Sequence, residues 1–167
     1  MQIRHITEND DRYAISHVYE ESWKYSYKDI IPQSYLDSIP KGRWADAIDN
    51  PEMHSLIMLK DEKIIGTSSY CKSRLSDMKE YGEIVSIYLL PEYIGKGYGK
   101  LLFKSAVDEL KKLGFNDMFL WVLDENHRAR RFYEKEGFTL SGRYLEVNIG
   151  GKDLIEVQYV LYGDYKV

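Results

Sequence analysis

A glycine-rich turn is the segment whose residue types point most directly to chemistry. Residues 91–102 read Pro-Glu-Tyr-Ile-Gly-Lys-Gly-Tyr-Gly-Lys-Leu-Leu, between an apolar stretch and a helical one. Glycine lets the backbone turn sharply and brings successive N–H groups near one point. A helix that starts there adds unpaired N–H groups and the positive end of its dipole, and Lys96 and Lys100 add charge. One such glycine alone would indicate only a tight turn, but three predict a phosphate or pyrophosphate site.

Two common phosphate-binding motifs fit this turn poorly. A nucleoside-triphosphate loop needs Ser or Thr after its Gly-Lys pair, whereas Leu101 follows Gly99 and Lys100. A dinucleotide fingerprint counted from Gly95 would need its third glycine at position 100. Asp124, which ends the next apolar stretch, would be the ribose-binding acid of that motif. The dinucleotide interpretation is therefore weakened but stays open.

Residues 95–102 resemble the acetyl-CoA loop of the GCN5-related N-acetyltransferase (GNAT) family, and Gly97 and Gly99 fill its glycine positions. Residues 126–138 are similar to the second motif of that family, N-x-x-A-x-x-x-Y-x-x-x-G-F, at every fixed place. The sequence departs from the first motif at Ile94, where the family usually has Gln or Arg. An isoleucine offers a phosphate only its backbone N–H.

The resemblance implies acetyl-CoA as co-substrate, with its diphosphate on the loop amides and its pantetheine arm beside the preceding strand. The residues that it assigns to the cofactor are Ile87, Tyr88, Leu89, Ile94, Gly95, Lys96, Gly97, Tyr98, Gly99, Lys100, Asn126 and Tyr133. It places the backbone N–H of Leu89 near the thioester oxygen, a catalytic contact whose loss raises the barrier by ~3 kcal/mol. Lys96 or Lys100 would compensate for the isoleucine at position 94.

The resemblance also implies that the acceptor of the acetyl group is an amine, which must lose a proton before it attacks the thioester. An alkylamine has a pKa of about 10.4, so keeping it neutral at pH 7 requires ~4–5 kcal/mol. Glu83 opens the apolar strand before the loop, where several members of the family carry a catalytic glutamate, and is the candidate general base. The alternative is a solvated strand-end glutamate that points away from the cleft.

Tyr133 is the candidate catalytic acid, because the family's tyrosine at this place points its hydroxyl at the CoA sulfur. Proton transfer from a phenol of pKa about 10 to a thiolate of pKa about 8.5 is uphill by ~2 kcal/mol, so a hydrogen-bonding role is a second interpretation. Ala129, Phe132 and Tyr133 also share one helix face, which would suit packing alone. Asn126 could cap this helix, contact the pantetheine, or do both.

Aromatic and acidic residues outside the two motifs are candidates for the acceptor side. Trp23 and Tyr27 belong to an aromatic cluster that would either pack between helices or line the pocket. The acids that could attract a cationic amine are Glu20, Glu21, Asp29 and Glu146. Cys71 is rejected as an acyl-carrying nucleophile, because no Cys–His–Asp order is visible and a lone cysteine at a strand end is usually inert.

The elements that position these residues follow from the hydrophobic pattern. Strands are predicted at 1–6, 55–59, 63–70, 82–90, 118–123, 138–149 and 153–161. Helices are predicted at 14–27, from the glycine turn to Leu113, and at 127–136, with short helical pieces at 32–36 and 42–48. Gly150 and Gly151 indicate a two-residue hairpin turn. The strand–helix–strand order around the glycine turn requires a parallel pair, and the flanking hairpins require antiparallel pairs.

We therefore expect one α/β (α+β) domain over residues 1–167, similar to that of the GNAT family. Its sheet would be mixed and mostly antiparallel, with six or seven strands, helices on both faces and a central parallel strand pair. A chain of 167 residues can form one sizeable core. The 15 tyrosines allow a homodimer, because tyrosine is enriched at interfaces.

Composition excludes several other classes of protein. The 23 Lys plus Arg against 27 Asp plus Glu give a formal charge of −4, which disfavours nucleic acid as a partner. One cysteine cannot form an internal disulfide, and the four histidines show no metal-ligand spacing. No apolar run approaches the ~18 residues of a membrane span and no secretory signal is visible, so we expect a cytoplasmic protein without a membrane partner.

The resemblance to the GNAT family, together with these features, implies an enzyme that transfers the acetyl group of acetyl-CoA to the primary amine of a small molecule or peptide. Direct attack in a ternary complex is expected, with neither a metal nor a covalent enzyme intermediate. A non-catalytic acyl-CoA-binding sensor is the alternative, and a dinucleotide-binding protein is a third interpretation. The identity of the acceptor amine does not follow from the sequence.

Overall fold

The computed structural model of the chain describes residues 1–163, and seven strands in this part form one sheet of order β1-β2-β3-β4-β5-β7-β6. The strands are β1 (Gln2–His5), β2 (His54–Lys60), β3 (Lys63–Lys72), β4 (Gly82–Leu89), β5 (Met118–Leu123), β6 (Thr139–Ile149) and β7 (Lys152–Leu161). Each neighbouring pair is antiparallel except β4 and β5, which are parallel. The mixed sheet with a central parallel pair is therefore confirmed.

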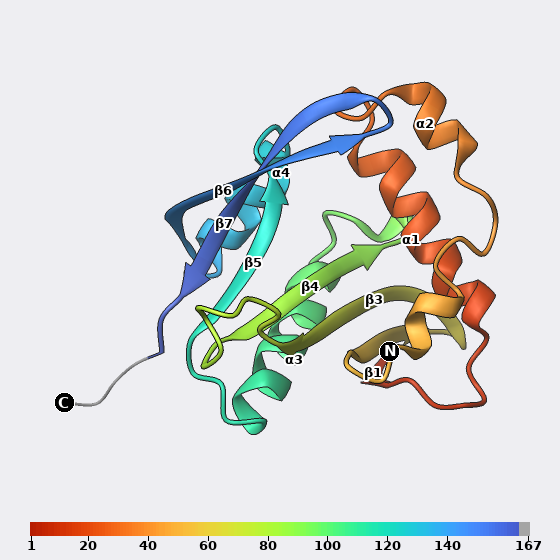
Figure 1. Cartoon of the computed structure of the whole chain (residues 1–167). Coiled ribbons are helices and arrows are strands. Elements are labelled where there is room, and N and C mark those ends of the chain that lie inside the picture. Colours follow the sequence, from red (N-terminus) through yellow and green to blue (C-terminus); the bar gives the residue numbers. More distant parts are fainter. Residues whose placement is uncertain (164–167) are drawn as a thin grey trace.

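Helices cover both faces of this sheet, as expected. They are α1 (Arg12–Ser26), α2 (Gln33–Ser38), α3 (Tyr98–Lys112) and α4 (His127–Lys135), with one-turn 3-10 helices η1 (Asp46–Asp49) and η2 (Pro91–Tyr93). Figure 1 shows α1 and α2 on one side of the sheet and α3 and α4 on the other. Side chains of successive strand residues point to opposite faces of a sheet. In β2, Ile57 belongs to the buried cluster that contains Ile15 of α1, whereas Met58 belongs to the cluster that contains Leu102 of α3.

Two local expectations need correction. The segment 42–48 is only partly helical, because residues 41–45 form turns before η1. Gly42 has a φ of 80°, outside the helical region, and its N–H donates to the Glu20 carboxylate at 2.7 Å. The helix that was expected to end at Leu113 ends at Lys112, so Leu113 lies beyond the buried face of α3. It is 49% exposed because it follows the last helical residue.

The parallel pair of β4 and β5 is short, which leaves the centre of the sheet open. Strands β4 and β5 pair at only two positions, Gly82 with Met118 and Glu83 with Phe119. The register of β4 against β3 then shifts at Val85, an extra residue that forms a β-bulge. Beyond the bulge β4 and β5 diverge (Figure 1), while β5 stays paired with β7 along its length. The sheet is therefore open at its centre.

The β6–β7 hairpin closes one side of this opening. Gly150 and Gly151 have φ values of 63° and 84°, which confirms the two-residue turn. The tip of the hairpin lies against the α2 region, because Lys152 Nζ donates to the Ile30 carbonyl at 2.8 Å. A Cβ added to Gly150 would lie 2.5 Å from Tyr35 Cβ, so the contact is close.

Candidate active site

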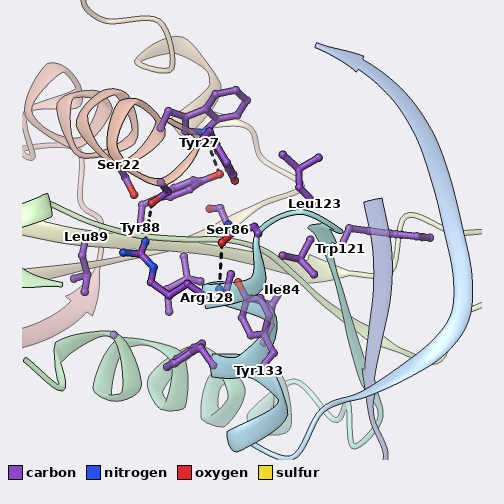
Figure 2. A pocket seen from close by; sticks show the side chains of 18 of the residues that line it. Ser22, Tyr27, Ile84, Ser86, Tyr88, Leu89, Trp121, Leu123, Arg128 and Tyr133 are labelled. Atoms are coloured by element: carbon purple, nitrogen blue, oxygen red, sulfur yellow. Dashed lines mark hydrogen bonds between the residues drawn. The ribbon is translucent and has the colours of Figure 1, made fainter. Parts of the chain in front are cut away.

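A cavity of about 750 Å³ occupies the divergence between β4 and β5. Figure 2 shows its lining side chains on α1, β4, β5 and α4. The predicted site residues that line it are Trp23, Tyr27, Glu83, Ile87, Tyr88, Leu89, Ile94, Gly95, Gly97, Gly99, Lys100, Asn126 and Tyr133. Lys96, Tyr98 and Glu146 are not among the lining residues. Most of the residues named from sequence thus come together around one space.

The glycine turn forms one wall of this cavity. Gly95 and Gly97 have φ values of 78° and 85°, which residues with a side chain rarely adopt, and no atom lies within 4 Å of a Cβ added at either position. The first backbone bond of α3 runs from the Leu101 N–H to the Gly97 carbonyl at 3.4 Å. The N–H groups of residues 98–100 therefore have no carbonyl partner within their own helix. This open turn at a helix start fits a diphosphate.

Charged side chains around the turn divide into two groups. Lys100 lines the cavity and its ammonium lies 3.3 Å from the Glu136 carboxylate at the end of α4. Lys96 instead lies over the ring of Tyr93, and Tyr98 accepts a hydrogen bond from Lys60 at 3.2 Å. Lys96 and Tyr98 thus belong to an aromatic and basic cluster beside the cavity.

The backbone N–H of Ile94, the only polar group it could offer a ligand, is already used. It donates to the Pro91 carbonyl at 3.1 Å within the turn of η2. Ile94 therefore contributes its apolar side chain to the cavity wall.

The edge of β4 that faces the gap carries free backbone groups. Leu90 donates its N–H to Ile65 of β3 at 2.9 Å. Because successive residues of a strand direct their N–H groups to opposite sides, those of Ile87 and Leu89 face the gap instead. Strand β5 no longer pairs with β4 at these positions. The Leu89 N–H thus faces the gap between β4 and β5.

Tyr133 presents its phenol to the cavity from α4 (Figure 2). Its ring packs against Phe103 and Phe138, so Tyr133 both packs in the core and lines the cavity. Burial raises the pKa of Tyr133 above the usual value, and interaction with Tyr88 raises it further. The hydroxyl therefore stays protonated at neutral pH. Asn126, also at the cavity, caps α4 by accepting from the Ala129 N–H at 3.2 Å.

Aromatic residues of α1 and β4 form the opposite wall. Trp23 Nε1 donates to the Tyr88 hydroxyl at 3.1 Å, and the Trp23 and Tyr27 rings meet edge to face, 4.9 Å apart. Burial raises the pKa of Tyr27 to about 12, although its hydrogen bond with Tyr88 opposes this shift. These hydroxyls are therefore neutral at pH 7, and the wall carries no charge.

Glu83 lines the cavity near the start of β4, away from the glycine turn, and is bonded to Arg74. Arg74 Nη2 donates to Oε1 at 2.6 Å, Nε donates to Oε2 at 3.0 Å, and the Arg74 backbone N–H donates to Oε2 at 3.2 Å. The Glu83 side chain is 3% exposed. The alternative of a solvated glutamate that points away from the cleft is therefore wrong, because Glu83 is buried and lines the cavity. Protonation of Glu83 would weaken its ion pair with Arg74.

Several lining residues were not identified from the sequence. Glu156 of β7 and Trp121 of β5 come from strands outside both motifs. Arg128 of α4 reaches to α1, where it donates to Ser26 Oγ at 3.0 Å and lies over the Tyr25 ring (Figure 2). The only signal for Glu156 was an acid within a mostly apolar strand, a pattern that many surface strands share.

The structure also bears on two other interpretations from the sequence, which concern Cys71 and a dinucleotide site. Cys71 is buried, which raises the pKa of its thiol to about 11, and it does not line the cavity, in keeping with its rejection. Asp124 pairs with Arg130 outside the cavity, and the mostly antiparallel sheet differs from the parallel sheet of dinucleotide-binding folds. The dinucleotide interpretation is therefore wrong.

Residues 1–163 contain neither a candidate metal site nor a helix that could cross a membrane. No three His, Cys, Asp or Glu side chains in this range are grouped so that they could hold a metal ion. None of its helices combines the length and apolar character needed to span a membrane.

Comparison with known proteins gives consistent matches. The sequence pattern of the acetyltransferase (GNAT) family matches residues 13–138. The uncharacterized N-acetyltransferase YuaI of Bacillus subtilis is 29% identical over 163 residues, covering 91% of this chain and 94% of that protein. The spermidine N(1)-acetyltransferase of Thermoplasma acidophilum is 28% identical over 140 residues, covering 78% and 84%. The crystal structure of PaiA N-acetyltransferase from Thermoplasma acidophilum in complex with coenzyme A superposes with a TM-score of 0.72, at 26% identity, covering 95% and 98%.

Proposed function

This chain belongs to the acetyltransferase (GNAT) family, and from that premise we propose that it transfers the acetyl group of acetyl-CoA to a primary amine within a ternary complex. One observation carries the proposal: a single cavity joins the glycine turn, the open edge of β4 and a group of aromatic and acidic side chains. Both reactants can therefore meet without a covalent enzyme intermediate.

The glycine turn and β4 would hold acetyl-CoA, which supplies the acetyl group as a thioester. The open space above Gly95 and Gly97 and the free N–H groups at the start of α3 suit its diphosphate. The gap-facing edge of β4 suits the pantetheine arm, and the Leu89 N–H would donate to the thioester oxygen as negative charge develops there. The similarity to PaiA, whose structure contains coenzyme A, supports this assignment.

Tyr133 would donate a hydrogen bond to the departing sulfur. Because burial raises the pKa of its phenol, complete proton transfer to a thiolate is more uphill than for a free phenol. The same shift keeps the hydroxyl available as a donor throughout the neutral range. Of the two roles considered from sequence, we therefore propose the hydrogen-bonding one.

The acceptor would enter beside the wall formed by Trp23 and Tyr27. This neutral aromatic wall suits the carbon chain of an amine, and the carboxylates that line the same cavity suit its ammonium group. One relative is a spermidine acetyltransferase, which supports an amine acceptor, either a small molecule or a peptide.

Calorimetry and a thiol-release assay test the proposal. Acetyl-CoA and CoA should bind saturably, whereas NAD should not. Free thiol should appear when acetyl-CoA is mixed with at least one member of a panel containing butylamine, tyramine, spermidine and a peptide with N-terminal alanine. Binding without thiol release for every amine would favour the sensor alternative, and absence of CoA binding would contradict both functions.

A further inference from the structure

Glu156 lies where three elements surround the cavity. Its Cα partners are Leu123 of β5 on one side and Leu145 of β6 on the other. Residues directly opposite one another in a sheet share a face, and Leu123 packs with Leu36 of α2. The Glu156 side chain is therefore on the α1 and α2 face, where it lines the cavity.

The two carboxylates at this part of the cavity differ in their partners. Glu83 accepts three bonds from Arg74, so their charges compensate each other. Glu156 has no hydrogen bond or ion pair within residues 1–163, and Arg74 acts on it only through electrostatic attraction. The Glu156 carboxylate thus has no partner of its own among residues 1–163, and it is free to accept an ammonium group.

The surroundings of Glu156 make that charge effective. Trp23, Tyr27 and Trp121 line the same cavity and reduce the water around it. Removal of water strengthens attraction between opposite charges, and aromatic faces add cation–π attraction for an ammonium group. Burial also raises the pKa of Glu156 above its usual value, with Arg74 opposing the shift. Glu156 is therefore a better proton acceptor than an exposed glutamate.

We propose that Glu156 is a catalytic residue that binds the ammonium group of the acceptor and takes its proton. This inference rests on the proposed acetyl transfer and names the acceptor as an amine that arrives as its ammonium ion. The assignment replaces Glu83 as the candidate base, since the Glu83 carboxylate is already paired with Arg74 and protonation would weaken that ion pair.

The proton and electron pairs balance as follows. One ammonium N–H bond breaks as an O–H bond forms on Glu156, and the freed lone pair forms the C–N bond to the acetyl carbon. The C–S bond breaks with its electron pair on sulfur, which accepts a hydrogen bond from the Tyr133 hydroxyl, and the second amine proton passes to this sulfur through water. Glu156 then returns its proton to water, so the products are the amide, the CoA thiol and one proton.

The pH profile of kcat/KM for the amine separates this role from a structural one. The titratable and charged groups that line the cavity with Glu156 are Arg74, Glu83, Tyr27, Tyr88, Lys100, Arg128, Tyr133, Lys135 and Glu136, of which Arg74 and Tyr27 interact with it electrostatically. Burial keeps the three tyrosines protonated through the neutral range, and Arg74 stays charged. In the wild type, kcat/KM should therefore fall at acid pH as Glu156 is protonated and fall again only above the amine pKa of about 10.4.

The experiment compares Glu156→Gln, Glu156→Asp and Glu83→Gln with the wild type, using the amine of the panel that releases most thiol. Glu80→Gln is the matched control, because Glu80 is exposed and outside the cavity. Calorimetry with acetyl-CoA checks each variant, and the dissociation constant should stay within about twofold because the glycine turn is unchanged.

Glu156→Gln should lower kcat/KM at pH 7 by about 100-fold or more. Between the acid and alkaline falls, the wild-type kcat/KM should form a plateau that does not change with pH. In Glu156→Gln this plateau should be replaced by a rise in kcat/KM of about tenfold per pH unit towards pH 10, because only amine that is already neutral can react. Glu156→Asp should keep the plateau at a lower rate, and Glu83→Gln should keep the wild-type shape. Unchanged kcat/KM and profile in Glu156→Gln, or the steep rise in Glu83→Gln instead, would overturn the inference alone. Wild-type protein that releases no thiol with any amine would overturn the proposed function as well.

Discussion

At the scale of single residues, protonation in the cavity is set by burial and by which charged groups meet. Tyr27, Tyr88 and Tyr133 all have raised pKa values because they are removed from water. Arg74 occupies the carboxylate of Glu83 and leaves that of Glu156 open. The cavity thus combines three phenols that keep their protons with one carboxylate that has no bonded partner, which are the groups that the proposed mechanism requires.

Replacing Tyr133 by Phe should lower kcat by about 10- to 100-fold, the range expected for a hydrogen bond to a charged group. The affinity for acetyl-CoA should change little, because the ring and its packing against Phe103 are kept. Because the pKa of Tyr133 is raised, wild-type kcat should show no loss from its ionisation below pH 10.

Thiol-release kinetics and calorimetry measure both quantities. Tyr144→Phe is the control, because Tyr144 is 62% exposed and outside the cavity. Unchanged kcat in Tyr133→Phe would remove the hydroxyl from the mechanism.

At the scale of elements, the turn before α3 combines an unusual backbone with open space. Its two left-handed glycines place the start of α3 at the cavity, and α3 is held there by a buried face of Leu102, Phe103, Ala106, Val107 and Leu110. The position of the diphosphate site thus depends on helix packing as well as on the loop sequence.

Gly97→Asp should weaken acetyl-CoA binding by more than tenfold, because its carboxylate would repel the diphosphate and fill the space above the turn. Gly114→Asp is the matched control. Gly114 also has a positive φ and open space, but it lies beyond the other end of α3. Both variants should lose stability through backbone strain, and calorimetry should find a weakened affinity only in Gly97→Asp. Retained affinity there would count against the loop assignment.

The connection from β1 to α1 depends on an ion pair at Asp10. Arg4 donates to both carboxylate oxygens at 2.7 Å, and the Thr7 N–H donates at 2.7 Å. These bonds, with that from Arg4 the largest influence, hold the pKa of Asp10 well below its usual value. Asp10→Asn should therefore lower the free energy of unfolding at pH 7 by about 1–2 kcal/mol.

The sign of the pH dependence follows from the lowered pKa. The stabilisation is complete above the unfolded pKa of about 3.9 and is lost as pH falls through the lower folded value. The difference between Asp10→Asn and wild type in urea unfolding should thus begin to shrink below about pH 4 and continue to shrink as the pH falls further. Asp108→Asn, an exposed site on α3, is the control. A difference that persists unchanged in acid would contradict the ion pair as the cause.

At the scale of the whole molecule, the sheet is divided by its own topology. Strands β1 to β4 form one antiparallel part and β5 to β7 another, and only two residue pairs of β4 and β5 join them. Arg128 adds a contact between α4 and α1 across the opening. A ligand between the two parts should therefore stabilise the whole fold.

Acetyl-CoA at about 100 times its dissociation constant should stabilise the folded state by about 2.7 kcal/mol. For a chain of this size, the Tm should rise by about 5–10 °C. Scanning calorimetry measures the shift, with NAD at the same concentration as the ligand control. An equal shift with NAD, or none with acetyl-CoA, would contradict specific binding in the cavity.

The sequence by itself determined the two motifs, the glycine turn and nearly all the strands and helices. These features are local: alternation of apolar residues, glycines at left-handed positions and helix caps such as Asn126 depend on near neighbours in the chain. The mixed sheet also followed, because a strand–helix–strand crossover permits only a parallel pair. Segment 42–48 was misjudged because the conformation of Gly42 depends on its bond to Glu20, which is distant in sequence.

Only the tertiary structure decided how the acidic residues divide their roles. Whether Glu83 is free depends on Arg74, which follows β3, and whether Glu156 reaches the cavity depends on where β5 leaves β4. Residue types do not contain that information, because solvation and pairing arise from chain segments brought together by the sheet. The sequence thus determined the glycine turn proposed to bind the diphosphate, and the packing of distant strands decided which carboxylate is paired and which is open to the cavity.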